Sequence, residues 1–344
     1  MARARMGPAS RPCWVSERRL ILLLFLALIA ALLLAVASGP YGLSPGQIIA
    51  LLLGARDDPQ ATTVLFKIRL PRVLAAALVG AALAAAGAAY QTVFRNPLVS
   101  PDILGVSAGA GFGAVLGILL GLPVIAIQLL GFGTGLATVA LVLALGLALR
   151  GGGQVLVMVL CGIAIGALAG AGISLVKLLA DPEDQLPAIT FWLMGSLAGI
   201  KRVDVALALP ALLIGFAPLM ALRWRIGILA MGEDEALAMG VNARHLRLLV
   251  ITCATLMTAA AVAMAGVIGW VGLMVPHMAR LLTGPRFDRL LPASVLIGAG
   301  FMLLVDTAAR SIASIEVPLG ILTAVLGAPV FLGLLTRGSR GWSE

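Results

Sequence analysis

The chain has 344 residues, of which 61% are hydrophobic and only 11% are charged, and its formal net charge is +9. An ordinary soluble domain is about 25% charged, and a mean hydropathy of +1.10 is too high for a core inside a solvated surface. These values exclude a soluble enzyme, a disordered chain and a nucleic-acid-binding domain. They predict an all-α protein that crosses a membrane several times. A transmembrane β-barrel is also excluded, because its strands alternate apolar and polar residues, whereas apolar runs here are long and unbroken.

The first apolar run covers residues 20–37 and could be either a cleaved signal or a first membrane helix. It follows Arg18 and Arg19, and it ends in Ala35-Val36-Ala37, which is similar to a signal-peptidase site. A secretory signal has an apolar core of about 7–15 residues. This run is longer and could cross a membrane, so we expect a retained first helix after an N-terminal tail of residues 1–19.

About ten membrane-crossing helices are predicted from the apolar runs and the residues that interrupt them. Pro71 fits the first turn of the second helix, and Pro276-His277 is expected to end a short eighth one. A short surface helix at 47–53 and a glycine-broken segment at 187–200 are expected between spans. The predicted spans are 20–38, 71–94, 101–120, 124–149, 155–179, 203–222, 249–266, 267–276, 291–309 and 319–336.

The distribution of basic residues predicts the orientation of these spans. An even number of spans places both termini on one side of the membrane. Roughly two-thirds of the 24 Lys and Arg residues fall in segments on that side, and such an excess marks the cytoplasm. We therefore expect one transmembrane domain, residues 1–344, with both termini cytoplasmic.

Sequence motifs for catalysis are absent. The chain has no G-x-S-x-G, H-E-x-x-H, C-x-x-C or Walker A pattern, so it is not expected to be an enzyme. If transport is driven by ATP, the ATPase must be another chain. Cys13, Cys161 and Cys253 are far apart, and the only histidines are His245 and His277. We expect neither a disulfide framework nor a bound metal or cofactor.

The segment from Met231 to Val241 is the most distinctive part of the sequence. It is acidic at its start, and a basic stretch, Asn242 to Leu248, follows it as an expected second short helix. Acidic residues suit the beginning of a helix and basic ones its end. Residues 228–248 are thus either a solvated cytoplasmic hairpin or a helical surface for docking a soluble partner.

This segment resembles the coupling helix of the FecCD family, the permeases of ATP-driven importers for iron siderophores, haem and cobalamin. The resemblance extends from about residue 40 to 337, and further sequence blocks carry it in the family's order. They are Arg69-Leu-Pro-Arg72 with Gly80-Ala-Ala-Leu83, Gln91 to Gly109, Gly266 to Arg280, and Pro318 to Pro329.

The resemblance implies a fold like that of the cobalamin-importer permease and a defined set of partners. In that family two copies of a ten-helix permease bind two ATPase subunits, which hold ATP and magnesium. A periplasmic or extracellular solute-binding protein delivers the ligand. We therefore expect a second copy of this chain, the ATPase, the binding protein and membrane lipid as partners, and no nucleic acid.

Three groups of site residues follow from the same resemblance. In the coupling helix, Ala236 and Leu237 are expected as apolar contacts in the ATPase groove. Helix five and the turn before it are expected to form the inner gate and part of the passage, although ordinary packing is the other interpretation. The coupling residues are Glu233, Asp234, Ala236, Leu237 and Gly240, and the gate and passage residues are Gly152, Gln154, Met158, Cys161, Ile165 and Leu168.

The third group consists of basic residues on the outer side. Arg69, Arg72 and Arg310 resemble family positions that meet acidic residues of the binding protein. A charge outside the membrane can steer an acidic partner to its surface. An intramolecular pair is the alternative, since Asp306 lies one helical turn before Arg310 and is rare as an acid within a membrane span.

The resemblance thus implies the permease subunit of an ATP-binding-cassette importer in a bacterial inner membrane, which moves a ferric siderophore or haem inward by alternating access. Cobalamin, molybdate and tungstate importers share the same blocks, so another metal complex or an oxyanion is the alternative substrate. A secondary transporter is a weaker alternative, because such proteins carry several intramembrane carboxylates and only Asp306 clearly qualifies here.

Overall fold

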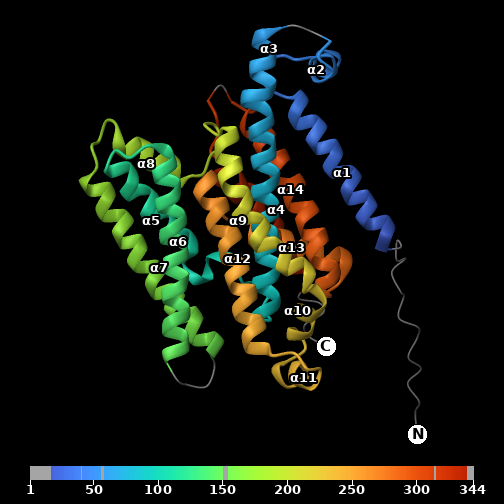
Figure 1. Ribbon diagram of the computed structural model, residues 1–344, viewed down its shortest axis with the longest axis vertical. Coiled ribbons are helices and arrows are strands. Elements are labelled where there is room, and N and C mark those ends of the chain that lie inside the picture. Colours follow the sequence, from blue (N-terminus) through green and yellow to red (C-terminus); the bar gives the residue numbers. More distant parts are fainter. Residues whose placement is uncertain (1–16, 40, 56–57, 150–153, 314, 339–344) are drawn as a thin grey trace.

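The computed structural model describes residues 17–39, 41–55, 58–149, 154–313 and 315–338, and within these ranges it contains helices and no strands (Figure 1). The predicted all-α class is therefore confirmed. The elements are α1 (Glu17–Ala37), α2 (Pro45–Leu52), α3 (Pro59–Thr63), a π-helical segment (Val64–Arg69), α4 (Leu70–Val93), a 3-10 turn (Pro101–Leu104), α5 (Val106–Leu119), α6 (Val124–Ala148), α7 (Gln154–Leu179), α8 (Gln185–Leu193), α9 (Arg202–Ala221), α10 (Arg223–Leu229), α11 (Glu233–Ala238), α12 (Ala243–Ala265), α13 (Val271–Thr283), α14 (Phe287–Ala309) and α15 (Leu319–Gly338).

Seven helical stretches of the described residues are long and apolar enough to cross a membrane: α1, α3 to α4, α6, α7, α9, α12 and α14. Two shorter apolar helices, α5 and α15, accompany them, and α13 is shorter still, with 13 residues. The chain is thus a multi-pass membrane protein. The expected number of about ten spans is approximate, because it is reached only when these three helices are counted with the long ones.

The two ends of the helical bundle carry different short elements, and we name the ends as Figure 1 orients them. The upper end carries α2, α3 and α8. The lower end carries α10 and α11. The predicted docking residues belong to the upper end, and the predicted coupling residues belong to the lower end.

Helix α4 lies at the centre of the bundle and packs against α12, α13 and α14. Glycine and alanine allow this close packing. A Cβ atom added to Gly80 would lie 2.1 Å from the carbonyl oxygen of Gly298, and one added to Gly87 would lie 1.8 Å from that of Gly272. The small residues of α4 therefore fix its position, and with it the position of Arg72 in the first turn of the helix.

The prediction that Pro71 lies in the first turn of an α-helix is confirmed, since α4 begins at Leu70, but the chain before it is helical too. Helical structure runs without a break from Pro59 to Val93, with the π-helical segment in between. Proline has no N–H to donate and its ring clashes with the preceding turn of a regular α-helix. The wider turn relieves this conflict: the N–H of Leu70 bonds five residues back, to the carbonyl of Leu65.

Two predicted boundaries further along the chain are wrong. Pro276 lies inside α13 rather than ending a helix, because residues 266–270 are not helical and α13 begins only at Val271. Gly266 and Trp270 both have positive φ angles, of 72° and 71°, which no helix accommodates. The basic stretch after Val241 is not a separate helix either: it forms the first turns of α12, capped by Asn242.

Candidate coupling, docking and passage sites

The coupling segment forms a single short helix, α11, at the lower end of the bundle (Figure 1). Ala236 is completely buried, and its carbonyl accepts the N–H of Val241 at 2.8 Å. Leu237, the next residue, is 73% exposed. Of the two expected apolar contacts, Ala236 therefore fixes α11 to the rest of the chain, and Leu237 is the one that a partner could bury.

The first turn of α11 is tied to α12 by an ion pair. Glu233 accepts a hydrogen bond from the guanidinium of Arg247, which is buried. This hydrogen bond and the charge of the guanidinium lower the pKa of the Glu233 carboxyl below its ordinary value, which favours its ionised form. Asp234 and Gly240 are exposed. Glu233 thus holds α11 in place from within the chain, while Asp234 and Leu237 are presented outward.

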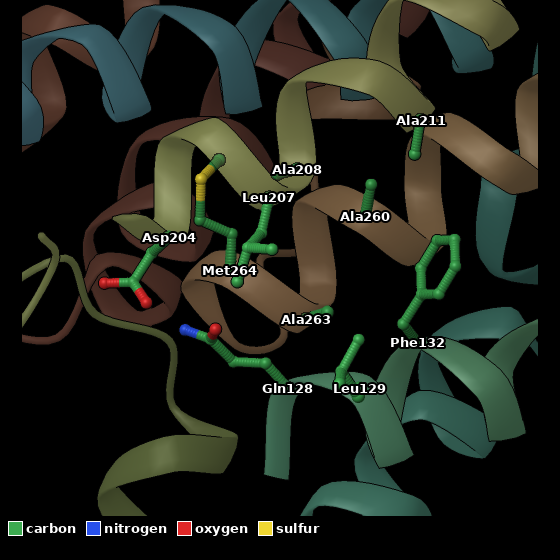
Figure 2. A pocket seen from close by; sticks show the side chains of 10 residues that line it. All are labelled: Gln128, Leu129, Phe132, Asp204, Leu207, Ala208, Ala211, Ala260, Ala263 and Met264. Carbon is green, nitrogen blue, oxygen red and sulfur yellow. The ribbon is translucent and has the colours of Figure 1, made fainter. Parts of the chain in front are cut away.

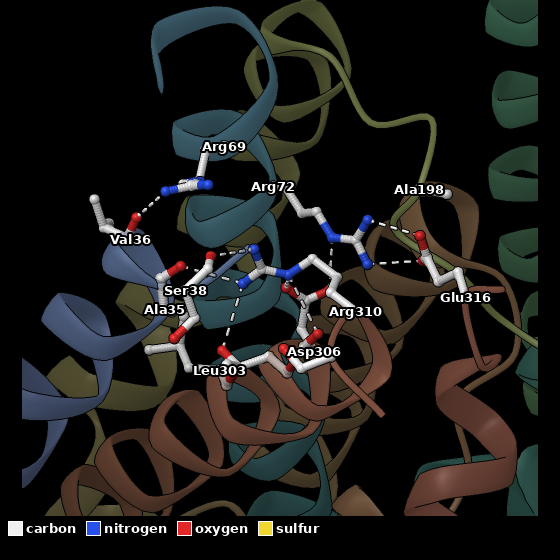
Figure 3. Close-up of polar contacts among 12 residues, drawn as sticks. Ala35, Val36, Ser38, Arg69, Arg72, Ala198, Leu303, Asp306, Arg310 and Glu316 are labelled. Carbon is white, nitrogen blue, oxygen red and sulfur yellow. Dashed lines mark hydrogen bonds and ion pairs between the residues drawn. The ribbon is translucent and has the colours of Figure 1, made fainter. Parts of the chain in front are cut away.

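Arg69, at the upper end, is buried and holds the end of α1 (Figure 3). Its guanidinium donates to the carbonyl oxygens of Val36 and Tyr41, both at 2.8 Å, and to that of Ala37 at 3.4 Å. The last carbonyls of a helix have no partners within it and carry partial negative charge. Arg69 therefore serves as a C-terminal cap for α1, a helix that is otherwise mostly exposed.

Arg72 and Arg310 belong to a cluster of buried charges at the same end (Figure 3). Asp306 lies between the two arginines, 2.8 Å from Nε of Arg72 and 3.1 Å from Nε of Arg310. Both terminal nitrogens of Arg72 also donate hydrogen bonds to the carboxylate of Glu316, at 2.9 and 2.7 Å. Arg310 further donates to the carbonyls of Ser38, at 3.0 Å, and Ala35, at 3.2 Å.

The three predicted docking residues are therefore engaged inside the chain. The alternative of an intramolecular pair between Asp306 and Arg310 is present in the structure. Glu316 was missed by sequence reasoning, although a single acid in the apolar stretch before Pro318 was a usable signal. The docking role of Arg69, Arg72 and Arg310 stays a prediction, and it must be compatible with these internal contacts.

The same arginines line an open hollow of about 720 Å³ at the upper end. Its wall includes Arg69, Arg72 and Arg310, and among the described residues that line it Glu316 is the only acid. Asp306 and Glu316 together offset the charges of Arg72 and Arg310, so the charge of Arg69 remains to attract a carboxylate. The hollow thus offers an acidic side chain from outside a place beside the arginines.

We predict that Arg69→Leu weakens the hold on α1. The variant loses charge-assisted hydrogen bonds, each contributing about 1.5–3 kcal/mol, so the free energy of unfolding in detergent should fall by about 2 kcal/mol or more. Lys67→Leu is the matched control, because Lys67 is an exposed cation in the same π-helical segment. Its expected effect is within about 0.5 kcal/mol. Equal effects of the two substitutions in thermal unfolding would contradict the capping role.

The predicted gate and passage residues belong to α7 and the turn before it. Gly152 lies outside the described residues, and Gln154 begins α7. Met158 is buried and would meet any Cβ added to Gly146, at 2.6 Å, so within the chain it is a packing residue. Cys161 and Ile165 are half-buried, whereas Leu168 is 72% exposed.

Helix α7 has a largely uncovered apolar face. It packs against α5 and α6 on one side, and only 11% of its most apolar stretch is buried. In a membrane such a face meets lipid or another protein helix. Its exposed large residues are Leu156, Leu160, Ile163, Leu168, Leu175, Leu178 and Leu179.

A crevice between α6, α9 and α12 has an apolar wall with two polar residues, Gln128 and Asp204 (Figure 2). Its volume is about 110 Å³, whereas pockets for drug-sized ligands measure about 300–1,000 Å³. The crevice is therefore small in this conformation, and the uncovered face of α7 is another place where a passage could form, between two chains.

Comparisons with known proteins agree on one family. The FecCD transport family matches residues 26–337. A probable iron chelatin transport system permease of Helicobacter pylori is 44% identical over 81% of this chain and 83% of its own length. The molybdate import system permease MolB of Haemophilus influenzae is 38% identical over 92% of this chain and 95% of its own. A solved metal-chelate type ABC transporter in an inward-facing conformation is 38% identical, with a TM-score of 0.86 over 93% of this chain and 99% of that one.

Proposed function

This chain belongs to the FecCD transport family and is thus the permease subunit of an ATP-binding-cassette transporter, and we propose that it carries an iron complex, a ferric siderophore or haem, inward across the inner membrane. The permease is not itself an enzyme, and ATP hydrolysis belongs to a separate ATPase chain. The similarity to the Helicobacter pylori iron chelatin permease carries the proposal of an iron complex.

Two copies of the chain, two ATPase subunits and a solute-binding protein make up the transporter that we propose. The exposed apolar face of α7 supports a passage between two copies. Its gate is proposed to include Gly152, Gln154, Met158, Cys161, Ile165 and Leu168. The exposed Leu237 on α11 supports ATPase docking at the lower end. The arginine-lined hollow supports docking of the binding protein at the upper end.

These docking surfaces imply an orientation. The lower end, with α11, faces the cytoplasm, where ATP is present, and the upper end faces the periplasm or the outside. Both termini then lie in the cytoplasm. ATP binding closes the ATPase dimer, α11 transmits this movement to the bundle, and the passage opens alternately to the two sides.

A second substrate class is favoured by one observation. The Haemophilus influenzae relative is a molybdate permease and aligns over more of this chain than the iron chelatin relative does. A permease for an oxyanion, molybdate or tungstate, is therefore the alternative, and cobalamin is a further one. The coupling helix and the partners that we propose do not depend on which of these substrates is carried.

Uptake in a strain that lacks this gene separates the candidates. We predict that uptake of an iron-55-labelled siderophore or haem is lost in the deletion strain, is restored by the intact gene, and needs the ATPase gene as well. Cobalamin and molybdate uptake should not change. Loss of molybdate uptake alone would overturn the iron proposal but leave the ATP-driven permease intact. Uptake without the ATPase would contradict the permease assignment itself.

A further inference from the structure

Glu316 differs from the other acid of the buried charge cluster in its exposure. Within that cluster, Arg72 and Arg310 face Asp306 and Glu316, so two positive charges balance two negative ones. The side chain of Asp306 is 1% exposed, whereas that of Glu316 is 23% exposed and lines the hollow. Of the two counter-ions of Arg72, Glu316 is therefore the one that a carboxylate from outside can reach and replace.

The hollow also carries a positive charge that no carboxylate of the described residues contacts, that of Arg69. Among the contacts of the described residues, Arg69 donates to backbone carbonyls, not to an acid. It lines the same hollow as Arg72 and Glu316. An incoming carboxylate is thus attracted to the hollow while Glu316 is still in place, and it then competes with Glu316 for Arg72.

Glu316 is linked to a junction of three segments at the upper end. Its carboxylate accepts a hydrogen bond from the hydroxyl of Ser196 at 3.2 Å, and Ser196 follows α8. The N–H of Ser196 donates to the carbonyl of Ala265 at 2.9 Å, at the end of α12. The N–H of Leu319, the first residue of α15, donates to the carbonyl of Gly195 at 2.9 Å.

Glycines make this junction tight. A Cβ added to Gly320 would lie 2.5 Å from the carbonyl oxygen of Met194, and one added to Gly266 would lie 2.3 Å from that of Trp192. The backbones are thus in direct contact, so movement of one segment is passed to the others. Glu316 lies three residues before α15, and its ion pair with Arg72 connects this junction to α4.

We infer that Glu316 is an exchangeable counter-ion: a carboxylate of the docked solute-binding protein replaces it on Arg72, and its release frees the start of α15 and the junction to move. This inference rests on the proposed function, since it requires a binding protein that docks at the upper end. It assigns Glu316 and Ser196 as positioning residues that connect docking with opening of the passage.

The test uses the permease reconstituted in nanodiscs with its ATPase subunits and its solute-binding protein. Glu316→Gln removes the competing charge, so the binding protein should dock about two- to fivefold more tightly at low salt. The ion pair between Glu316 and Arg72 is then absent from the start, so the start of α15 is already free to move. The basal ATPase rate should therefore rise toward the stimulated rate, and the stimulation by the binding protein should shrink. Glu183→Gln is the matched control, because Glu183 is an exposed glutamate in the turn before α8 and should change neither value.

A second variant keeps the inference testable if Glu316→Gln does not fold. Ser196→Ala leaves the charges in place but removes the hydrogen bond that connects Glu316 to the junction. The affinity for the binding protein should therefore stay at the wild-type value, whereas the stimulation of the ATPase should fall. Unchanged or weaker docking of Glu316→Gln, or a basal rate equal to that of wild type, overturns the inference. Normal stimulation of Ser196→Ala overturns it as well. Wild-type complexes that no binding protein stimulates would instead contradict the proposed function.

Discussion

Replacing Leu237 by aspartate is expected to abolish ATP-driven uptake while leaving the permease folded in the membrane. Leu237 is 73% exposed on α11, so the chain's own core does not depend on it. Burying a leucine in a partner's groove contributes about 1.5–3 kcal/mol, and an unpaired carboxylate there costs several more. Association with the ATPase should therefore weaken by about 100-fold or more.

Co-purification of the ATPase and ATP-dependent uptake into vesicles measure this effect. Leu237→Met is the matched control, because it keeps an apolar side chain of similar size at the same place, and its uptake should stay near the wild-type rate. Ala236→Asp is expected to behave differently: Ala236 is fully buried, so that variant should lower the permease's own stability. Normal uptake by Leu237→Asp would remove α11 from the coupling role.

Removal of the Asp306 carboxylate is expected to cause the largest loss of stability that any single substitution at the upper end produces. Asp306 is completely buried and faces both Arg72 and Arg310. Breaking a buried ion pair by removing one partner costs about 3–5 kcal/mol, because the other charge stays buried without compensation. Proteins are stable by only about 5–15 kcal/mol, so Asp306→Ala should unfold at a much lower temperature in detergent.

Asp288→Ala provides the control on the same helix. Asp288 lies in the first turn of α14 and pairs with Arg286 at 2.8 Å, but the arginine side chain is 60% exposed. Exposed ion pairs contribute about 0–1 kcal/mol. If Asp306→Ala and Asp288→Ala lowered the unfolding temperature equally, the buried cluster would not be what holds α1, α4 and α14 together.

The spans and the coupling helix were predictable because their signals are local in the sequence. Long apolar runs predict α1, α6 and α7, and the acidic start of the segment after Met231 predicts α11. Helix boundaries failed where local rules meet tertiary packing. The helix that contains Pro71 continues upstream to Pro59 through a π-helical segment, and a positive φ at Trp270 delays the start of α13.

The burial of the docking arginines could not be predicted from local sequence. Arg72 pairs with Asp306 and Glu316, which are 234 and 244 residues away in the sequence. Arg69 bonds to Val36 at the end of α1, which is 33 residues away. Such contacts depend on how α1, α4 and α14 assemble, which neither composition nor periodicity encodes. Only the pair of Asp306 with Arg310, one turn apart on the same helix, was within reach of sequence reasoning.

The most direct test of the whole account is uptake by proteoliposomes that contain this permease and its ATPase, with the binding protein and an iron-55-labelled siderophore or haem added outside. We expect uptake only when ATP is enclosed with the ATPase. The unlabelled iron complex should compete with the labelled one, and molybdate should not. Uptake that follows an ion gradient without ATP would contradict the ATP-driven permease, and uptake that molybdate abolishes would contradict the iron substrate.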